Sequence, residues 1–161
     1  MKIINILTNK YRRHNILKSF CSVGSNLTIF GNPSFVNPQK IIIGNNVNIN
    51  DGVIINATCS EIQIGDMVTI SSNAMILAAS YDVDHFLYKD SANEKRNHKY
   101  SKVVIGNNVW ICAGAIILPN VSIADYVVVG AGSVVTHSIN ESHVLVAGNP
   151  AQIIKHISCD K

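Results

Sequence analysis

An apolar residue recurs at every sixth position over long stretches of this sequence, and that spacing limits the folds open to the chain. The longest run is Ile105, Ile111, Ile117, Ile123, Val129 and Val135. Shorter runs with the same spacing are Ile43, Ile49 and Ile55, then Ile64, Ile70 and Ile76. An α-helix repeats about every 3.6 residues and a half-buried strand alternates, so neither explains the pattern.

A chain that coils with short extended sides explains the repeat, because every sixth side chain then points inward and stacks on the next coil. Three hexads close one triangular coil, and the sequence holds five such sets, at residues 23–40, 43–60, 64–81, 105–122 and 123–140. With about 4.8 Å between hydrogen-bonded strands, the stack would be roughly 24 Å tall. Pairs such as Asn-Asn, Asp-Gly and Ala-Gly fall where the coil must turn, and these residues tolerate positive φ. The sequence predicts an all-β fold of about five coils, not a β-sandwich.

The repeat stops between residues 78 and 102 and resumes at Val103. This segment is rich in polar and charged residues and contains two of the six histidines, His85 and His98. Long loops inside compact repeat proteins are usually functional. We therefore expect residues 78–102 to form a loop excursion that carries the chemistry.

Two segments, 103-VVIGNNVWICAGAIILPNVSIADYVVVGAGSVVTHSI-139 and 144-VLVAGNPAQIIKHI-157, resemble the hexapeptide-repeat acyltransferases. The resemblance is to the maltose and galactoside O-acetyltransferases and to sugar acetyltransferases that decorate polysaccharides, and it covers residues 23 to about 157. It implies a left-handed parallel β-helix and transfer of an acetyl group from acetyl-CoA to a sugar hydroxyl, for instance on a building block of a cell-surface polysaccharide. It also implies a homotrimer in which the excursion reaches toward a neighbouring subunit.

The two ends flank the predicted β-helix of residues 23–140. Apolar residues spaced by four in residues 1–22 predict a short helical cap, which a β-helix needs because its end coils expose strand edges. The basic residues of that segment could instead favour an anionic membrane surface. Residues 141–161 are expected to form a tail with a short helix that begins near Pro150, since proline suits the first turn of a helix.

Acetyl transfer to a hydroxyl requires a base, stabilisation of the oxyanion and alignment of both reactants. The resemblance implies direct transfer with a histidine as base, and the family pattern places that histidine at Tyr81 of this chain. Tyrosine, with a pKa of about 10, is a poor base at neutral pH. His85 is therefore the predicted base, with Asp82 or Asp84 as its orienting carboxylate, and His98 is the alternative. Tyr81 could act through its phenol, and Asp84 is also a candidate for substrate contact.

The resemblance further implies where acetyl-CoA would bind. The predicted cofactor positions are Ala113, Ala131, Thr136, His137, Gln152 and Lys155. The two alanines would line the groove that receives the pantetheine arm, and Lys155 would meet the CoA phosphates. His137 stands where relatives often have lysine, and Gln152 replaces a common arginine. Asn50 matches an asparagine that faces the acceptor or the oxyanion.

Composition and spacing argue against several other kinds of protein. The chain is 47% hydrophobic and 14% charged with a net charge of +3, and it contains no nucleic-acid-binding motif. No apolar run reaches the roughly 18–20 residues of a membrane-spanning helix, and the N-terminus has no secretory pattern. The four cysteines stand singly, so we expect reduced thiols in a cytoplasmic protein and no metal.

Three other functions are alternatives to the sugar acetyltransferase. Serine acetyltransferase would carry a large helical N-terminal domain, whereas about 20 residues precede the repeat here. A zinc carbonic anhydrase on this fold needs three converging histidines, and the six present include no H-x4-H pair. A non-catalytic scaffold or binding module stays open because of Tyr81.

Overall fold

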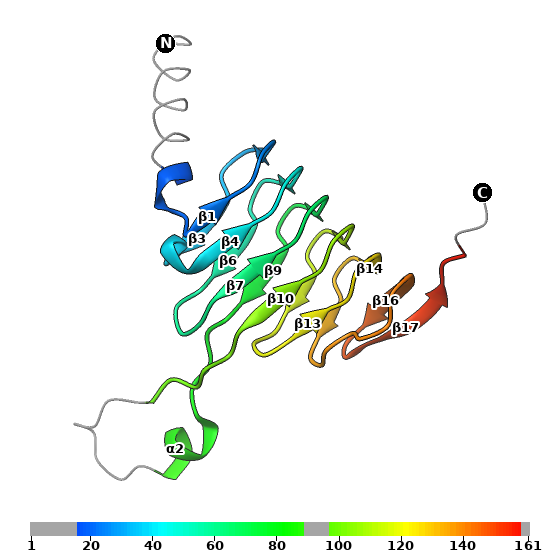
Figure 1. Cartoon of the computed structure of the whole chain (residues 1–161). Coiled ribbons are helices and arrows are strands. Elements are labelled where there is room, and N and C mark those ends of the chain that lie inside the picture. Colours follow the sequence, from blue (N-terminus) through cyan, green and yellow to red (C-terminus); the bar gives the residue numbers. More distant parts are fainter. Residues whose placement is uncertain (1–15, 89–96, 159–161) are drawn as a thin grey trace.

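The computed structural model describes residues 16–88 and 97–158, which form a parallel β-solenoid with the excursion at its side (Figure 1). In the described part of the chain the strands make three sheets along the solenoid. The first sheet contains β1 (Ser22–Val23), β4 (Ile41–Ile43), β7 (Ile62–Ile64), β10 (Val103–Ile105) and β13 (Ser122–Ile123). The third contains β3 (Ser34–Val36), β6 (Ile54–Asn56), β9 (Met75–Leu77), β12 (Ile116–Ile117) and β15 (Val134–Val135).

The second sheet extends further than the other two. Its strands are β2 (Thr28–Ile29), β5 (Asn48–Ile49), β8 (Thr69–Ile70), β11 (Trp110–Ile111), β14 (Val127–Val129), β16 (Val144–Gly148) and β17 (Ala151–His156). The described residues thus make five complete coils, and β16 continues the parallel pairing into a sixth. The all-β fold and the coil predicted from the six-residue repeat are confirmed.

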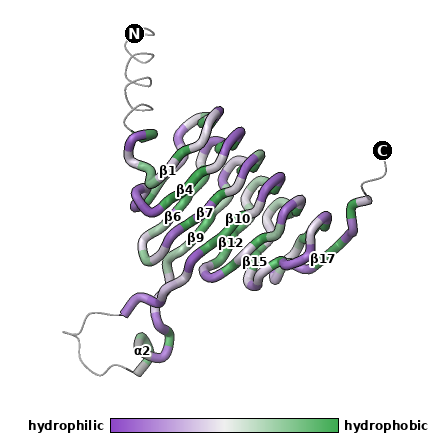
Figure 2. Tube along the Cα trace, in the orientation of Figure 1, coloured by the Kyte–Doolittle hydropathy of each residue, from purple (hydrophilic) through white to green (hydrophobic). Residues whose placement is uncertain are grey.

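The core is a set of stacked aliphatic columns inside the coils. Parallel pairing aligns Ile49 with Ile70, Ile70 with Ile111, and Ile111 with Val129, so one inward residue from each coil lies on the next. All four are fully buried. In Figure 2 hydrophobic residues follow the strands, and hydrophilic residues gather at the turns. Every sixth position is therefore apolar because it contributes one layer to a column.

A ladder of side-chain oxygens joins the turns between the first and second sheets. In each turn an Asn or Asp accepts a hydrogen bond from a backbone N–H of the preceding coil, at 2.6–2.9 Å; the acceptors are Asn45, Asp66, Asn107 and Asp125. The coils approach closely here, and a Cβ added to Gly65 would lie 2.7 Å from the carbonyl oxygen of Gly106. The small second residue of the hexads is explained by this close approach.

The N-terminal end of the core is covered by one aromatic pair. Residues 16–19 are helical, and Phe20, which follows them, is buried with its ring edge-on to Phe35 at 4.9 Å. The rest of the predicted cap, residues 1–15, lies outside the described residues. Among the helices that the structure describes, none is long and apolar enough to cross a membrane.

The predicted short helix at the C-terminus is wrong. Residues 151–156 form β17, which runs antiparallel to β16 and pairs Gln152 with Ala147 and Lys155 with Leu145. The open edge of β16 offers unpaired N–H and C=O groups, and an extended partner satisfies them. Pro150 is compatible with either structure, and the adjacent β-branched Ile153 and Ile154 favour a strand.

Two short helical elements interrupt the coils. The 3₁₀ helix η1 (Pro38–Lys40) turns the chain from β3 to β4. The helix α2 (Val83–Tyr88) lies in the excursion, which leaves the solenoid after β9 and returns to β10 (Figure 1). The sequence predicts a loop at residues 78–102, and the structure adds the short helix α2 within it.

Candidate active site

The two legs of the excursion are joined where they leave the solenoid. Tyr81 on the outgoing leg and His98 on the return leg form an antiparallel bridge. Beside it the backbone N–H of Asp82 donates to the carbonyl oxygen of Asn97 at 3.0 Å. This paired neck holds α2 away from the coil stack, as Figure 1 shows.

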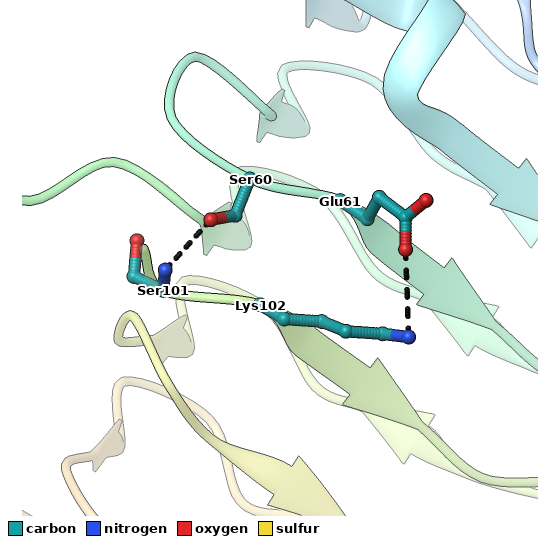
Figure 3. A network of polar contacts seen from close by, with 4 residues as sticks. All are labelled: Ser60, Glu61, Ser101 and Lys102. Atoms are coloured by element: carbon teal, nitrogen blue, oxygen red, sulfur yellow. Dashed lines mark hydrogen bonds and ion pairs between the residues drawn. The ribbon is translucent and has the colours of Figure 1, made fainter. Parts of the chain in front are cut away.

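The return leg is fixed to the solenoid by polar contacts (Figure 3). The backbone N–H of Ser101 donates to Oγ of Ser60 at 2.6 Å, and both residues are buried. Next along the chain, Nζ of Lys102 lies 3.4 Å from Oε2 of Glu61, at the start of the pairing between β7 and β10. The excursion can therefore be long without disturbing the register of the following coil.

Three side chains meet at the neck. The ring of Tyr81 stacks on the imidazole of His98 with 4.6 Å between centroids. The other partner of His98 is Cys59, whose Sγ lies 3.0 Å from Nδ1. We call Cys59, Tyr81 and His98 the neck cluster. This cluster could not be predicted from the sequence, because Cys59 and His98 are 39 residues apart and belong to different parts of the coil stack.

The predicted catalytic residues lie in and beside α2. Asp82 directly precedes the helix and its carbonyl oxygen accepts the backbone N–H of Phe86 at 2.8 Å, while Asp84 lies in the first turn and is exposed. His85 also belongs to α2, but its side chain lies outside the described part of the structure. Tyr81 contacts this helix through Phe86, with ring centroids 5.9 Å apart.

The predicted pantetheine positions, Ala113 and Ala131, lie one above the other in the turns between the second and third sheets. The carbonyl oxygen of Ala113 accepts the backbone N–H of Gly132 at 2.9 Å, and both alanines are exposed. A Cβ at Gly132 would meet no atom within 4 Å. These turns therefore leave backbone open to an approaching ligand. Beside Ala113, burial raises the pKa of the Cys112 thiol, so this group stays protonated at neutral pH.

Asn50 occupies the corresponding turn two coils before Ala113. Its side-chain Nδ2 and its backbone N–H both donate to the carbonyl oxygen of Ile70, each at 3.0 Å. The amide therefore bonds to the adjacent coil, with one Nδ2 hydrogen and Oδ1 remaining for other partners.

The other predicted cofactor residues are near the C-terminal end. Oγ1 of Thr136 lies 2.8 Å from Nδ1 of His137. His137 and Gln152 line the same open pocket of about 440 Å³, together with Ser138, Ile139, Asn140, Glu141, Val146, Ala151 and Ile153. Lys155 is exposed further along β17 and does not line this pocket. The pairing of β17 with β16, which the sequence did not predict, forms one wall.

In one chain the candidate residues lie on opposite borders of the third sheet. Asn50, Ala113 and Ala131 precede its strands, whereas the excursion, Thr136 and His137 follow them. At about 3.3 Å per residue, three-residue strands such as β9 separate the two borders by roughly 10 Å. The excursion and the pantetheine turns are thus not brought together within a single coil stack. Across residues 16–88 and 97–158, no three His, Cys, Asp or Glu side chains converge as metal ligands.

Comparison with known proteins gives the same family over most of the chain. The family model described as bacterial transferase hexapeptide (six repeats) matches residues 102–137. The chain is 34% identical to the galactoside O-acetyltransferase of Escherichia coli (strain K12), in a match that covers 91% of this chain and 70% of that protein. It is 37% identical to a putative lipopolysaccharide biosynthesis O-acetyl transferase, WbbJ, of the same organism, over 88% of this chain and 70% of that protein.

The structure agrees with the sequence comparison. It superposes on a galactoside acetyltransferase solved in complex with coenzyme A with a TM-score of 0.79 and 33% identity, covering 92% of this chain and 71% of that one. Both matches to galactoside acetyltransferases cover more than nine-tenths of this chain. The chain therefore belongs to the hexapeptide-repeat acetyltransferase family.

Proposed function

We propose that this protein transfers an acetyl group from acetyl-CoA to a hydroxyl of a sugar or saccharide. The observation that carries the proposal is the likeness, over 92% of the chain, to a galactoside acetyltransferase solved with coenzyme A. The identity of 37% to a protein named for lipopolysaccharide biosynthesis favours a building block of a cell-surface polysaccharide as the acceptor.

In the proposed reaction His85 acts as the general base. It takes the proton of the acceptor hydroxyl while the hydroxyl oxygen attacks the thioester carbonyl. The tetrahedral intermediate then collapses, the carbon–sulfur bond breaks, and the sulfur of CoA receives the proton from His85. Asp82 or Asp84 would orient the imidazole, since both lie at the start of the same short helix. Asn50 would face the acceptor or the oxyanion with its remaining N–H.

Acetyl-CoA would bind along the turns between the second and third sheets. The exposed backbone at Ala113 and Ala131 suits the narrow pantetheine arm, because side chains larger than methyl would block it. His137 and Gln152 would contact the far part of the cofactor at the pocket beside β17, with Thr136 next to His137. Lys155 would attract the phosphates from the exposed face of that strand.

We further propose that the protein is a homotrimer with its active sites between subunits. On the outer face of the third sheet an apolar residue from each of four successive strands lies in register: Ile54, Met75, Ile116 and Val134. Such a stripe favours burial against another copy. The excursion of one subunit would then approach the pantetheine turns of its neighbour, which one chain alone leaves on opposite borders of the sheet.

The test of the proposed function is acceptor-dependent release of CoA. Purified protein is incubated with acetyl-CoA and a panel of galactosides, maltose and nucleotide-linked sugars, and free CoA thiol is measured against a reaction without acceptor. Release above that background with at least one saccharide, and an acetylated product of matching mass, is expected. Background release with every acceptor, together with no thermal shift in millimolar acetyl-CoA, would instead favour the scaffold function.

A further inference from the structure

We propose that the neck cluster is a positioning device for catalysis, in which Cys59 holds His98, and His98 and Tyr81 together hold α2. The inference rests on the proposed function in one respect, namely that α2 carries the general base His85. It assigns to Tyr81, and to His98, a role other than proton transfer.

A continuous series of contacts links the solenoid to α2. Cys59 is fixed at the end of the second coil, because its backbone N–H donates to the carbonyl oxygen of Ala78 in the third coil at 3.1 Å. Its thiol meets His98, the imidazole of His98 stacks on Tyr81, and Tyr81 contacts Phe86 of α2. A shift of Cys59 or His98 would therefore be transmitted to the residue beside His85.

In the proposed arrangement the thiol of Cys59 donates to Nδ1 of His98, which leaves the ring proton on Nε2. The thiol hydrogen has two acceptors in reach, Nδ1 of His98 at 3.0 Å and the carbonyl oxygen of Ser80 at 3.8 Å, and the nearer one makes the stronger bond. When Nδ1 of a neutral imidazole accepts, the proton of the ring is on Nε2. His98 then presents a donor to its surroundings and has no free nitrogen with which to remove a hydroxyl proton. Its chemistry suits support of the neck, not general base catalysis.

A six-residue helix needs such support. Isolated helices shorter than about 12 residues are marginal in water, so α2 depends on its tertiary contacts. Reacting groups must also be held closely, since a displacement of about 1 Å can lower the rate on the order of 100-fold. A loosened neck would therefore lower kcat while leaving the pantetheine turns at Ala113 and Ala131, on the opposite border of the third sheet, unchanged.

The first test compares substitutions at the neck in the full-length protein. We expect Cys59→Ala and His98→Ala each to lower kcat by about 10- to 100-fold, with an unchanged KM for acetyl-CoA. Cys59→Ser keeps a donor for Nδ1 and should retain most of the wild-type kcat. The double variant Cys59→Ala/His98→Ala should lose no more than His98→Ala alone, because both act through one contact. Cys21→Ala removes an exposed thiol next to β1 and is the matched control, with wild-type kinetics expected.

The second test separates positioning from base catalysis. The dependence of kcat/KM on pH should keep the rising limb of the general base in His98→Ala, at a lower amplitude. Loss of that limb in His98→Ala but not in His85→Ala would overturn the proposal and make His98 the base. Wild-type kcat in both Cys59→Ala and His98→Ala would overturn it as well.

A third measurement does not depend on activity. Amide hydrogen exchange of residues 83–88 should be faster in Cys59→Ala and His98→Ala than in the wild type, Cys59→Ser or Cys21→Ala, with no change in β7 or β10. Unchanged exchange of residues 83–88 would contradict the positioning role. If these amides respond as expected while no saccharide is acetylated by the wild type, the proposed function fails and the neck cluster stands as a structural support.

Discussion

At the scale of single residues, most residue types suit the backbone conformation of their position in the coil, but Met67 does not. It adopts a left-handed conformation with φ of 57° in the turn between the first and second sheets and is 58% exposed. Asn26, Asn46 and Asn108 hold that conformation in the same turn of other coils. A side chain with a Cβ is strained there, and asparagine is the residue that tolerates it best after glycine.

We therefore predict that Met67→Asn raises the free energy of unfolding by up to about 1 kcal/mol. Urea unfolding followed by circular dichroism would measure it. Met67→Ala is the control, because alanine removes the exposed side chain but keeps the strain, so it should give no gain. Equal stabilisation by both variants would show that strain at this turn is not the cause.

A second prediction for a single residue concerns His85, the proposed general base. His85→Ala should lower kcat by about 10²- to 10⁴-fold, the usual contribution of a base acting in the transition state. The melting temperature and the affinity for acetyl-CoA should stay the same, since α2 lies apart from the core and from the pantetheine turns. Tyr81→Phe keeps the stacked ring and removes only the phenol, so it should retain activity. Full turnover of His85→Ala on an accepted saccharide would refute the assignment.

At the scale of elements, the packing between coils controls stability. Gly65→Ala would place a Cβ 2.7 Å from both Oδ1 of Asn107 and the carbonyl oxygen of Gly106, so two coils would have to separate. We predict a loss of about 1–3 kcal/mol in the free energy of unfolding, as is usual for overpacking. The reverse change, Ala124→Gly, at the corresponding turn of the fifth coil should cost about 1 kcal/mol or less. Thermal unfolding of both variants measures these losses. An equal loss of stability in the two would show that close contact between coils does not limit the residue at this turn.

The same elements explain what the sequence could predict. The coils were predictable because the residues that point inward, such as Ile49, Ile70 and Ile111, must be apolar. Since an inward residue occurs at every sixth position, the sequence shows a period of six. The strand β17 could not be predicted, because it forms only by pairing with β16 and because Pro150 permits either a helix or a strand. The boundaries of the excursion followed from the interruption of the repeat. The contact of Cys59 with His98 could not be predicted from the sequence, since only the stacking of coils brings these residues together.

At the scale of the whole molecule, the site is proposed to be completed by a second copy, and this can be tested by disrupting the apolar stripe. Ile116→Lys would place a charge on the outer face of the third sheet, where it would have to be buried at the proposed contact. Val128→Lys makes a comparable change on the outer face of the second sheet and is the matched control. Light scattering should give three times the chain mass of 17.5 kDa for the wild type and Val128→Lys, and a monomer for Ile116→Lys.

The proposed trimer should be required both for binding of acetyl-CoA and for acetylation of the acceptor. A ligand at 100 times its dissociation constant stabilises the folded state by about 2.7 kcal/mol, so acetyl-CoA should raise the melting temperature of the wild type and of Val128→Lys. In Ile116→Lys the groove between subunits is lost, so both this shift and acceptor-dependent CoA release should disappear while the solenoid stays folded by circular dichroism. A monomeric Ile116→Lys with wild-type kcat would show that one chain holds a complete site, and the excursion would then have to close onto its own coil stack.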